Sequence, residues 1–182
     1  MQTKKTTEQY FDELIAEAMK IGIEKMSIYG TSWTSYDPDS LLVRMLNKAK
    51  RITTLIQTKE NKVGEKISGE FKEILNYGTM LCMMVENNIP LDVDLEPDDV
   101  TKYRELCFQK VKELMIKKNH DYGEAWRTMS QMNIVAEVKV KIRRMKSLFS
   151  LSEKPDIENV YDIMNYCAFA LILIEEKIHQ DL

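Results

Sequence analysis

Both halves of this chain carry the same short sequence, Tyr-Gly-x-x-Trp, at residues 29–33 and at residues 122–126. The correspondence extends to other positions, which pair as Tyr10 with Tyr103, Lys25 with Lys118, Lys48 with Lys141, Arg51 with Arg144, and Asn76-Tyr77 with Asn165-Tyr166. Such self-similarity predicts two tandem copies of one unit that bury a common core. We place the first repeat unit at 1–88, an acidic connector with two prolines at 89–98, and the second repeat unit at 99–182.

The segments between the glycine and proline residues have a composition typical of helices. Glycine and proline number only 6 and 4, and Met, Leu, Ile, Lys and Glu dominate elsewhere. Thr6 with Gln9 predicts a capping box, and Asp37-Pro38 and Ser130 predict helix starts. Six main helices are expected, near residues 8–27, 38–57, 69–86, 98–119, 131–149 and 156–179. The predicted fold is all-α, with two tandem three-helix units packed as one pseudo-two-fold bundle and therefore an intrachain pseudo-dimer. A further homodimer is left open.

The net charge and composition argue against nucleic acids and membranes as partners. The net charge of −3 gives no electrostatic reason to expect DNA, RNA or an anionic membrane. The three cysteines stand alone on apolar stretches, which is typical of small core residues in a reducing compartment. The most apolar run, at 167–174, is shorter than the roughly 20 residues of a membrane span. We expect a cytoplasmic protein with no membrane partner.

Acidic side chains gather on the third helix of each unit. Glu158, Asp162 and Asn165 share one helix face, and Glu70 and Glu73 stand at the same part of the first unit. Carboxylates at helical spacing are how helical bundles hold Mg²⁺. The alternative is a solvated helix face. For the repeated Asn-Tyr pair, the alternative to a ligand contact is a buried hydrogen-bond network between the units.

Basic side chains gather on the middle helices. Lys48 with Arg51, and Lys141 with Arg144, are spaced i, i+3. An arginine can bind phosphate oxygens through two nitrogens while a lysine contributes a point charge, so this pattern suits a phosphate group. The alternative is that these cations form salt bridges with the acidic helix.

The segment at 117–127 has the densest mixture of polar and aromatic groups in the chain. Tyr122 and Trp126 could stack on a base, and His120 or Asp121 could bind a ligand or transfer a proton. The first unit keeps the Tyr-Gly and Trp but lacks the charged residues. We therefore interpret the shared skeleton as a structural turn over a packed Trp. The charged and titratable residues found only in the second unit are His120, Asp121, Glu124 and Arg127, so we expect the functional site in this unit.

Three motifs together carry a family resemblance. The run Lys-Asn-His-Asp-Tyr-Gly-Glu-Ala-Trp at 118–126, then Lys141-x-x-Arg144, then Asp162-x-x-Asn165-Tyr166, resembles the nucleotide modification-associated domain 1 family. More distantly, the chain is similar to all-α nucleoside triphosphate pyrophosphohydrolases of the MazG and dimeric dUTPase type, in which two acidic pairs on neighbouring helices surround Mg²⁺. This chain has a partial second pair, but basic residues occupy its middle helices where the first pair is expected.

These features and the resemblance together suggest a protein that binds a nucleotide or nucleotide-like small molecule, and the distant resemblance implies Mg²⁺-dependent hydrolysis to a monophosphate and pyrophosphate. In that scheme the metal ligands are Glu158 and Asp162, with Glu70 and Glu73 in the first unit, and the catalytic residues are Asp121 and Glu124. The residues expected to bind the nucleotide or its phosphate are Lys118, His120, Tyr122, Trp126, Arg127, Lys141, Arg144, Asn165 and Tyr166, with Lys48 and Arg51 in the first unit. The alternative is a non-catalytic helical interaction or structural module. It predicts that the acidic and basic strips pair with each other, whereas an open pocket lined by Asp162, Lys141 and Asp121 favours an enzyme.

Overall fold

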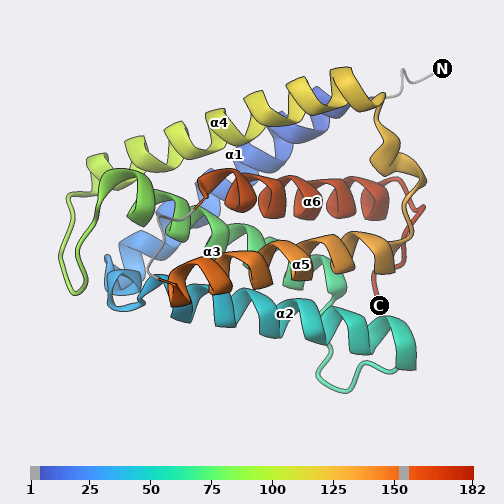
Figure 1. The fold of residues 1–182 in the computed structure, drawn as a ribbon, viewed down its shortest axis with the longest axis horizontal. Helices are drawn as coiled ribbons and strands as arrows, with labels where there is room; N and C mark the ends of the chain where they lie inside the picture. The colour runs from blue at the N-terminus through green and yellow to red at the C-terminus, as the bar shows by residue number, and fades with distance from the viewer. Residues whose placement is uncertain (1–4, 152–155) are drawn as a thin grey trace.

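The computed structural model describes residues 5–151 and 156–182. Within these ranges the chain forms six α-helices and two short 3-10 helices, η1 and η2, and no strand (Figure 1). In chain order the elements are α1 (Thr7–Tyr29), η1 (Ser32–Ser35), α2 (Pro38–Thr58), α3 (Ile67–Asn87), α4 (Pro97–Tyr122), η2 (Ala125–Thr128), α5 (Gln131–Ser150) and α6 (Ile157–Glu175). The predicted all-α fold with six main helices is confirmed.

Local sequence signals determine where most helices begin. At α1 the predicted capping box is present, because Gln9 donates its backbone N–H to the Thr6 hydroxyl and Thr6 donates to the Gln9 side chain at 2.8 Å. The Asp37 carboxylate caps α2, and the Ser130 hydroxyl caps α5. The last helix ends at Glu175, earlier than predicted, because Lys177 adopts a φ of 60° that turns the chain out of the helix.

The two units pack so that each helix meets its counterpart. Helix α3 lies against α6, α2 against α5, and α1 crosses α4 on one side of the molecule (Figure 1). Gly78 permits the close approach of the central pair, since a Cβ at this position would lie 2.9 Å from the Met164 Cγ. This arrangement is the predicted pseudo-two-fold bundle.

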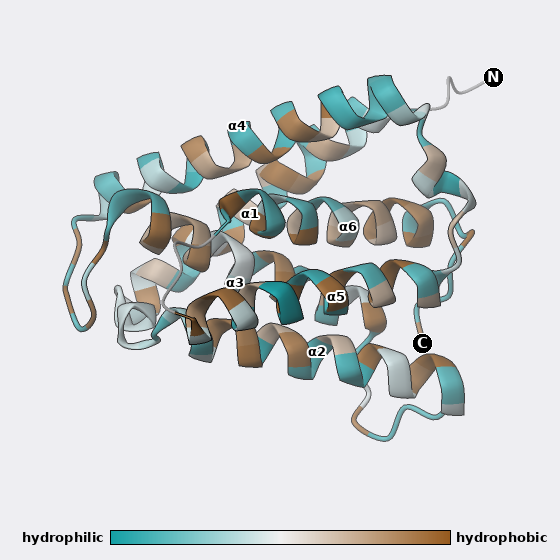
Figure 2. Ribbon diagram, viewed as in Figure 1, coloured by the Kyte–Doolittle hydropathy of each residue, from teal (hydrophilic) through white to brown (hydrophobic). Residues whose placement is uncertain are grey.

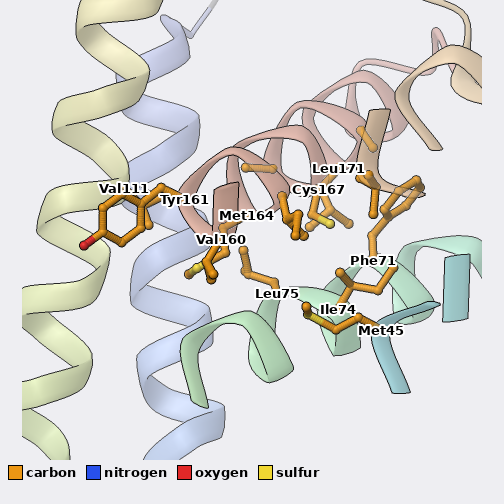
Figure 3. Packing of buried hydrophobic residues seen from close by; sticks show 14 of the residues in the cluster. Met45, Phe71, Ile74, Leu75, Val111, Val160, Tyr161, Met164, Cys167 and Leu171 are labelled. Atoms are coloured by element: carbon orange, nitrogen blue, oxygen red, sulfur yellow. The ribbon is translucent and has the colours of Figure 1, made fainter. Parts of the chain in front are cut away.

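The core collects apolar side chains from both units around α6. Figure 3 shows Met164 and Cys167 of α6 with Leu75 and Ile74 of α3, and Tyr161 beside Val111 of α4. Hydrophobic and hydrophilic residues alternate along the helices, as expected when one face of each helix is buried (Figure 2). Helix α6 is long and apolar enough to cross a membrane by those criteria alone, and 78% of its most apolar 18-residue window is buried inside the protein. The three cysteines are free and buried, as predicted for core residues.

The repeated Tyr-Gly-x-x-Trp sequence has the same structural role in each unit. Gly30 and Gly123 end α1 and α4 with φ values of +57° and +59°, a conformation that other residues rarely adopt. Each glycine reverses the chain into a 3-10 helix whose tryptophan, Trp33 or Trp126, is buried beneath the turn. The expectation that this skeleton is structural is confirmed.

Candidate functional site

An open cavity of about 480 Å³ lies in the second unit between α4, η2, α5 and α6. A second hollow of about 630 Å³ adjoins it and extends toward the start of α6. The residues that line both hollows, and therefore stand where the two meet, are Lys118, Lys141, Arg144 and Asp162. All four were predicted as site residues from separate sequence motifs.

Two lysines bind one carboxylate at this junction, and an arginine without a partner among the described residues lines the same two hollows. Asp162 is buried, and Lys118 binds one of its carboxylate oxygens while the Lys141 Nζ lies 2.6 Å from the other. Arg144 is exposed and has no hydrogen bond or ion pair with any residue that the structure describes. Three further acids lie away from the junction, since Glu137 lines only the first cavity, and Asp156 and Glu158 line only the second hollow. The junction therefore has an excess of positive charge.

Aromatic rings form one wall of the first cavity. The Trp126 ring stacks on Phe169 with centroids 4.3 Å apart, and the Tyr166 ring meets Phe169 edge-on at 6.2 Å. The Arg127 guanidinium also lies over the Trp126 ring, at 4.5 Å. Phe169 and Arg127 therefore cover the indole that was expected to stack on a base. Tyr122, which is exposed, and Tyr166, which is half-buried, are the rings available to a ligand.

Polar groups at the aromatic end of this cavity include one without a partner. Asn119 accepts a hydrogen bond from the Trp126 Nε1 at 3.1 Å. Asn165 donates its Nδ2 to the Val111 carbonyl oxygen at 3.3 Å, while its buried Oδ1 accepts no hydrogen bond from any described residue. A buried acceptor without a donor is costly, so the Asn165 oxygen is a natural contact for a ligand N–H or O–H. Burial also raises the pKa of the Tyr166 hydroxyl, with the charges of Glu137 and Asp162 adding to the effect.

The four charged additions of the second unit lie outside the cavity. His120 and Asp121 are exposed and contact each other, with the His120 Nδ1 3.0 Å from the Asp121 Oδ1. Arg127 binds Glu124 at 2.7 Å and is 3.0 Å from Glu176 near the end of α6. Thr7 joins this network by contacting both Glu124 and Arg127, which fastens η2 to α1. The predicted catalytic role of Asp121 and Glu124 stays a prediction, and neither residue lines the cavity.

The first-unit residues that correspond to Lys141, Arg144 and Asp162 form ion pairs that neutralise their charges. Lys48 pairs with Glu73 and lies 3.5 Å from Glu70, and Arg51 pairs with the buried Glu70 and lies 3.3 Å from Glu65. Burial lowers the pKa of Lys48, but its hydrogen bond to Glu73 and the charge of Glu70 outweigh this and hold the pKa above its ordinary value. The structural alternative predicted pairing between the acidic and basic strips. This pairing involves both cations of the strip in the first unit, and in the second unit it involves Lys141 with Asp162 but not Arg144.

One substitution between the units removes the buried acidic partner of the arginine. The register that aligns Asn76-Tyr77 with Asn165-Tyr166 places Asn159 at the position of Glu70. Asn159 is neutral and donates its Nδ2 to the Asp156 carboxylate at 2.9 Å. Arg144 therefore lacks the glutamate that binds Arg51 in the first unit. We did not select Asn159, Asn119 or Phe169 from the sequence, although the alignment of the two units contains the signal for Asn159.

The acidic residues do not fit a resident Mg²⁺. Both carboxylate oxygens of Asp162 are held by lysines, and Glu158 is exposed at the rim of the second hollow. Glu70 and Glu73 are bound by Lys48 and Arg51. Within residues 5–151 and 156–182, no three side chains of the His, Cys, Asp or Glu type are grouped so that they could share a metal ion. Mg²⁺ prefers several unencumbered oxygen ligands, which this set does not supply.

Comparison with protein families identifies both units. The model of a family described as nucleotide modification associated domain 1 matches residues 25–85 and residues 118–174. Each segment contains the turn with its tryptophan and the two helices that follow it, so the matches confirm the duplication. No curated protein and no solved structure matches the chain.

Proposed function

The chain belongs to the nucleotide modification associated domain 1 family, and from this membership and the geometry of the second unit we propose that it binds a nucleotide there. The phosphate lies at the junction of Lys118, Lys141 and Arg144, and the base and sugar occupy the cavity beside Tyr122 and Tyr166. The single observation that carries this proposal is the excess of cations at the junction, where Arg144 has no partner among the described residues.

The three cations proposed to bind the phosphate have different roles. Asp162 holds the Lys118 and Lys141 ammonium groups in place, so their positions are fixed before a ligand arrives. Arg144 is free to place two N–H groups on phosphate oxygens, which is the geometry that guanidinium groups favour. A phosphate supplies the negative charge that Asn159 does not, and it thereby occupies the electrostatic role that Glu70 has in the first unit.

The other end of the cavity suits a base and a sugar. Its volume of about 480 Å³ lies in the range of small-molecule sites, which are roughly 300–1,000 Å³. Tyr122 and Tyr166 offer aromatic surface for stacking. The unpartnered Asn165 Oδ1 and the half-buried Glu137 carboxylate accept hydrogen bonds, so both are suited to the N–H groups of a base or the hydroxyls of a sugar.

Hydrolysis is not included in this proposal. The pyrophosphohydrolases that the chain distantly resembles surround a metal with two acidic pairs. Here the one buried carboxylate of the junction, Asp162, is bound by two lysines, and the middle helix contributes cations. The residues present therefore favour binding of a nucleotide over a metal-assisted reaction on it.

Calorimetric titration with nucleoside mono- and triphosphates, each with and without Mg²⁺, tests binding. We expect micromolar to millimolar affinity for at least one nucleotide and none for its nucleoside, because the phosphate makes the charged contacts. Arg144→Gln should weaken binding about tenfold to a hundredfold, because it removes the positive charge and up to two charged hydrogen bonds. The matched variant Arg51→Gln should leave the affinity within about twofold. Absence of binding by every nucleotide at millimolar concentration would contradict the proposal, as would equal affinity for nucleotide and nucleoside.

A further inference from the structure

Arg104 of α4 is a buried cation without a counter-ion in the part of the chain that the structure describes. Only 5% of its surface is exposed, and its one hydrogen bond runs from NH1 to the Asn76 Oδ1 at a long 3.4 Å. Burial lowers the pKa of Arg104 below its ordinary value, yet a guanidinium remains protonated in proteins. No described residue accepts a hydrogen bond from its Nε or Nη2, and neither atom is fully enclosed by the protein. These N–H groups are therefore available to an anion, and a largely buried charge without a counter-ion favours binding one.

The guanidinium of Arg104 lines an open cavity of about 550 Å³ in the first unit. The lining of this cavity contains no Asp or Glu. It contains a second cation, Lys25, which is exposed and has no ion pair with any described residue. Four aromatic side chains belong to the same lining, Tyr29, Trp33, Tyr36 and Tyr77, and the Arg44 guanidinium covers the Tyr36 ring at 4.1 Å. A pocket with two cations, no acid and several rings is complementary to an anion that carries a flat ring.

The position of Arg104 depends on a glycine in the facing helix. A Cβ on Gly22 of α1 would lie 2.7 Å from the Arg104 Cζ, so the guanidinium lies directly against the α1 backbone. The counterpart of Arg104 in the other unit is Phe11, which meets Phe169 edge-on at 6.0 Å within the core. Phe11 does not line the second-unit cavity, so that cavity has no counterpart of the Arg104 charge.

We propose that the first-unit cavity is a separate ligand site, which binds a phosphate monoester that carries a planar ring, the class to which nucleoside monophosphates belong. Arg104 donates two N–H groups to the phosphate, Lys25 adds a second positive charge at the rim, and the ring lies against Tyr29 and Tyr77. This site shares no residue with the junction of Lys118, Lys141 and Arg144, so it does not depend on the function proposed for the second unit.

The chain has two tryptophans, and each cavity contains one of them. Fluorine NMR of the full chain labelled with fluorotryptophan therefore reports the two sites separately, with resonances assigned from Trp33→Phe and Trp126→Phe. Uridine monophosphate is the probe, and uridine and inorganic phosphate are the controls. We expect saturable movement of the Trp33 resonance with uridine monophosphate and none with uridine. Movement with inorganic phosphate should need a concentration at least about tenfold higher, because the ring contacts are missing.

Arg104→Gln should weaken the Trp33 response about tenfold to a hundredfold and leave the Trp126 response unchanged. Gly22→Ala is a second variant that keeps the charge but displaces the guanidinium, and it should also weaken the Trp33 response. A buried cation without a counter-ion opposes folding, so Arg104→Met should melt at the temperature of the parent or above it.

Two results would overturn this inference: a Trp33 resonance that does not move with uridine monophosphate, or one that moves equally in Arg104→Gln. A lower melting temperature of Arg104→Met together with an unchanged ligand response in Gly22→Ala would also overturn it, by assigning Arg104 a purely structural role. The Trp126 resonance reports the second-unit site, so failure of one site is distinguishable from failure of the other.

Discussion

The two units present the same helices and the same cations, but they differ in the carboxylates that face those cations. In the first unit Glu70 binds Arg51 and Glu73 binds Lys48, so both cations are already paired with carboxylates of the protein. In the second unit Asn159 and Asp162 occupy those positions, and Arg144 is left without a protein partner among the described residues. A duplicated scaffold can thus keep one copy self-neutralised and leave the other open to an anion, and the change from glutamate to asparagine removes the buried partner of the arginine.

Burial decides which unpaired cation is costly. Arg144 is exposed, so water solvates its charge and the second unit loses little by leaving it unpaired. Arg104 is largely buried, so water solvates its charge far less. The first unit therefore neutralises its middle helix, while Arg104, which α4 of the second unit contributes, leaves a charge that no described residue pairs at the first-unit cavity. The two cavities are related by pseudo-symmetry. The arginine without a counter-ion in the described part of the chain is Arg144 of α5 in the second-unit cavity and Arg104 of α4 in the first-unit cavity.

The largest expected difference between the units is in folding stability. Trp126 stacks on Phe169 and donates to Asn119, and no equivalent ring stacking or indole hydrogen bond is found for Trp33 among the described residues. Trp126→Ala should lower the free energy of unfolding by about 4 kcal/mol. Trp33→Ala should cost about 1–2 kcal/mol less, because it removes neither an aromatic pair nor a hydrogen bond. Equal losses in free energy of unfolding for the two variants, measured by chemical denaturation, would contradict the view that Trp126 makes the more stabilising contacts.

A smaller effect is expected when the first unit is given the second unit's residue. Glu70→Asn removes the buried carboxylate from Arg51, and the first-unit strip should then bind inorganic pyrophosphate about tenfold more tightly than in the parent. Calorimetry would show this as an additional binding event. Glu70→Asp keeps the charge and is the matched control, so a gain in that variant would count against the charge explanation.

The smallest predicted effect is a dependence of stability on pH. His179 donates its Nε2–H to the carbonyl oxygen of Met129, a residue of the second-unit cavity, at 3.0 Å. Burial lowers the pKa of His179 below 6.5, although its backbone hydrogen bond opposes the shift. The unfolded chain then binds more protons than the folded one just below pH 6.5, so this contribution to stability is complete above that pH and declines as the pH falls toward the lowered pKa. Denaturation of His179→Gln between pH 5 and 7, values chosen to bracket roughly this range, should give a flatter profile than the parent. An identical profile would contradict the assignment.

The fold was more predictable than the site because its signals are local. The capping box at Thr6 and the cap at Asp37 involve residues three positions apart, and they mark helix starts without any knowledge of tertiary structure. The convergence of Lys118, Lys141 and Asp162 was predictable as a set, since each belongs to a recognisable motif. The placement of Glu124 and Arg127 was not, because their partners Thr7 and Glu176 lie at opposite ends of the chain. Only the packing of η2 between α1 and α6 brings these residues together.

The account depends most directly on the neutral residue at position 159. Calorimetric titration of a nucleotide that binds the parent should be repeated with Asn159→Glu and with Asn159→Gln, which has a similar size and no charge. We predict that Asn159→Glu, by giving Arg144 the partner that Arg51 has, weakens nucleotide binding at the second-unit site about a hundredfold. Asn159→Gln should remain within about threefold of the parent. Unchanged affinity in Asn159→Glu, or an equal loss in both variants, would contradict the claim that charge at this position opens the second unit to a phosphate.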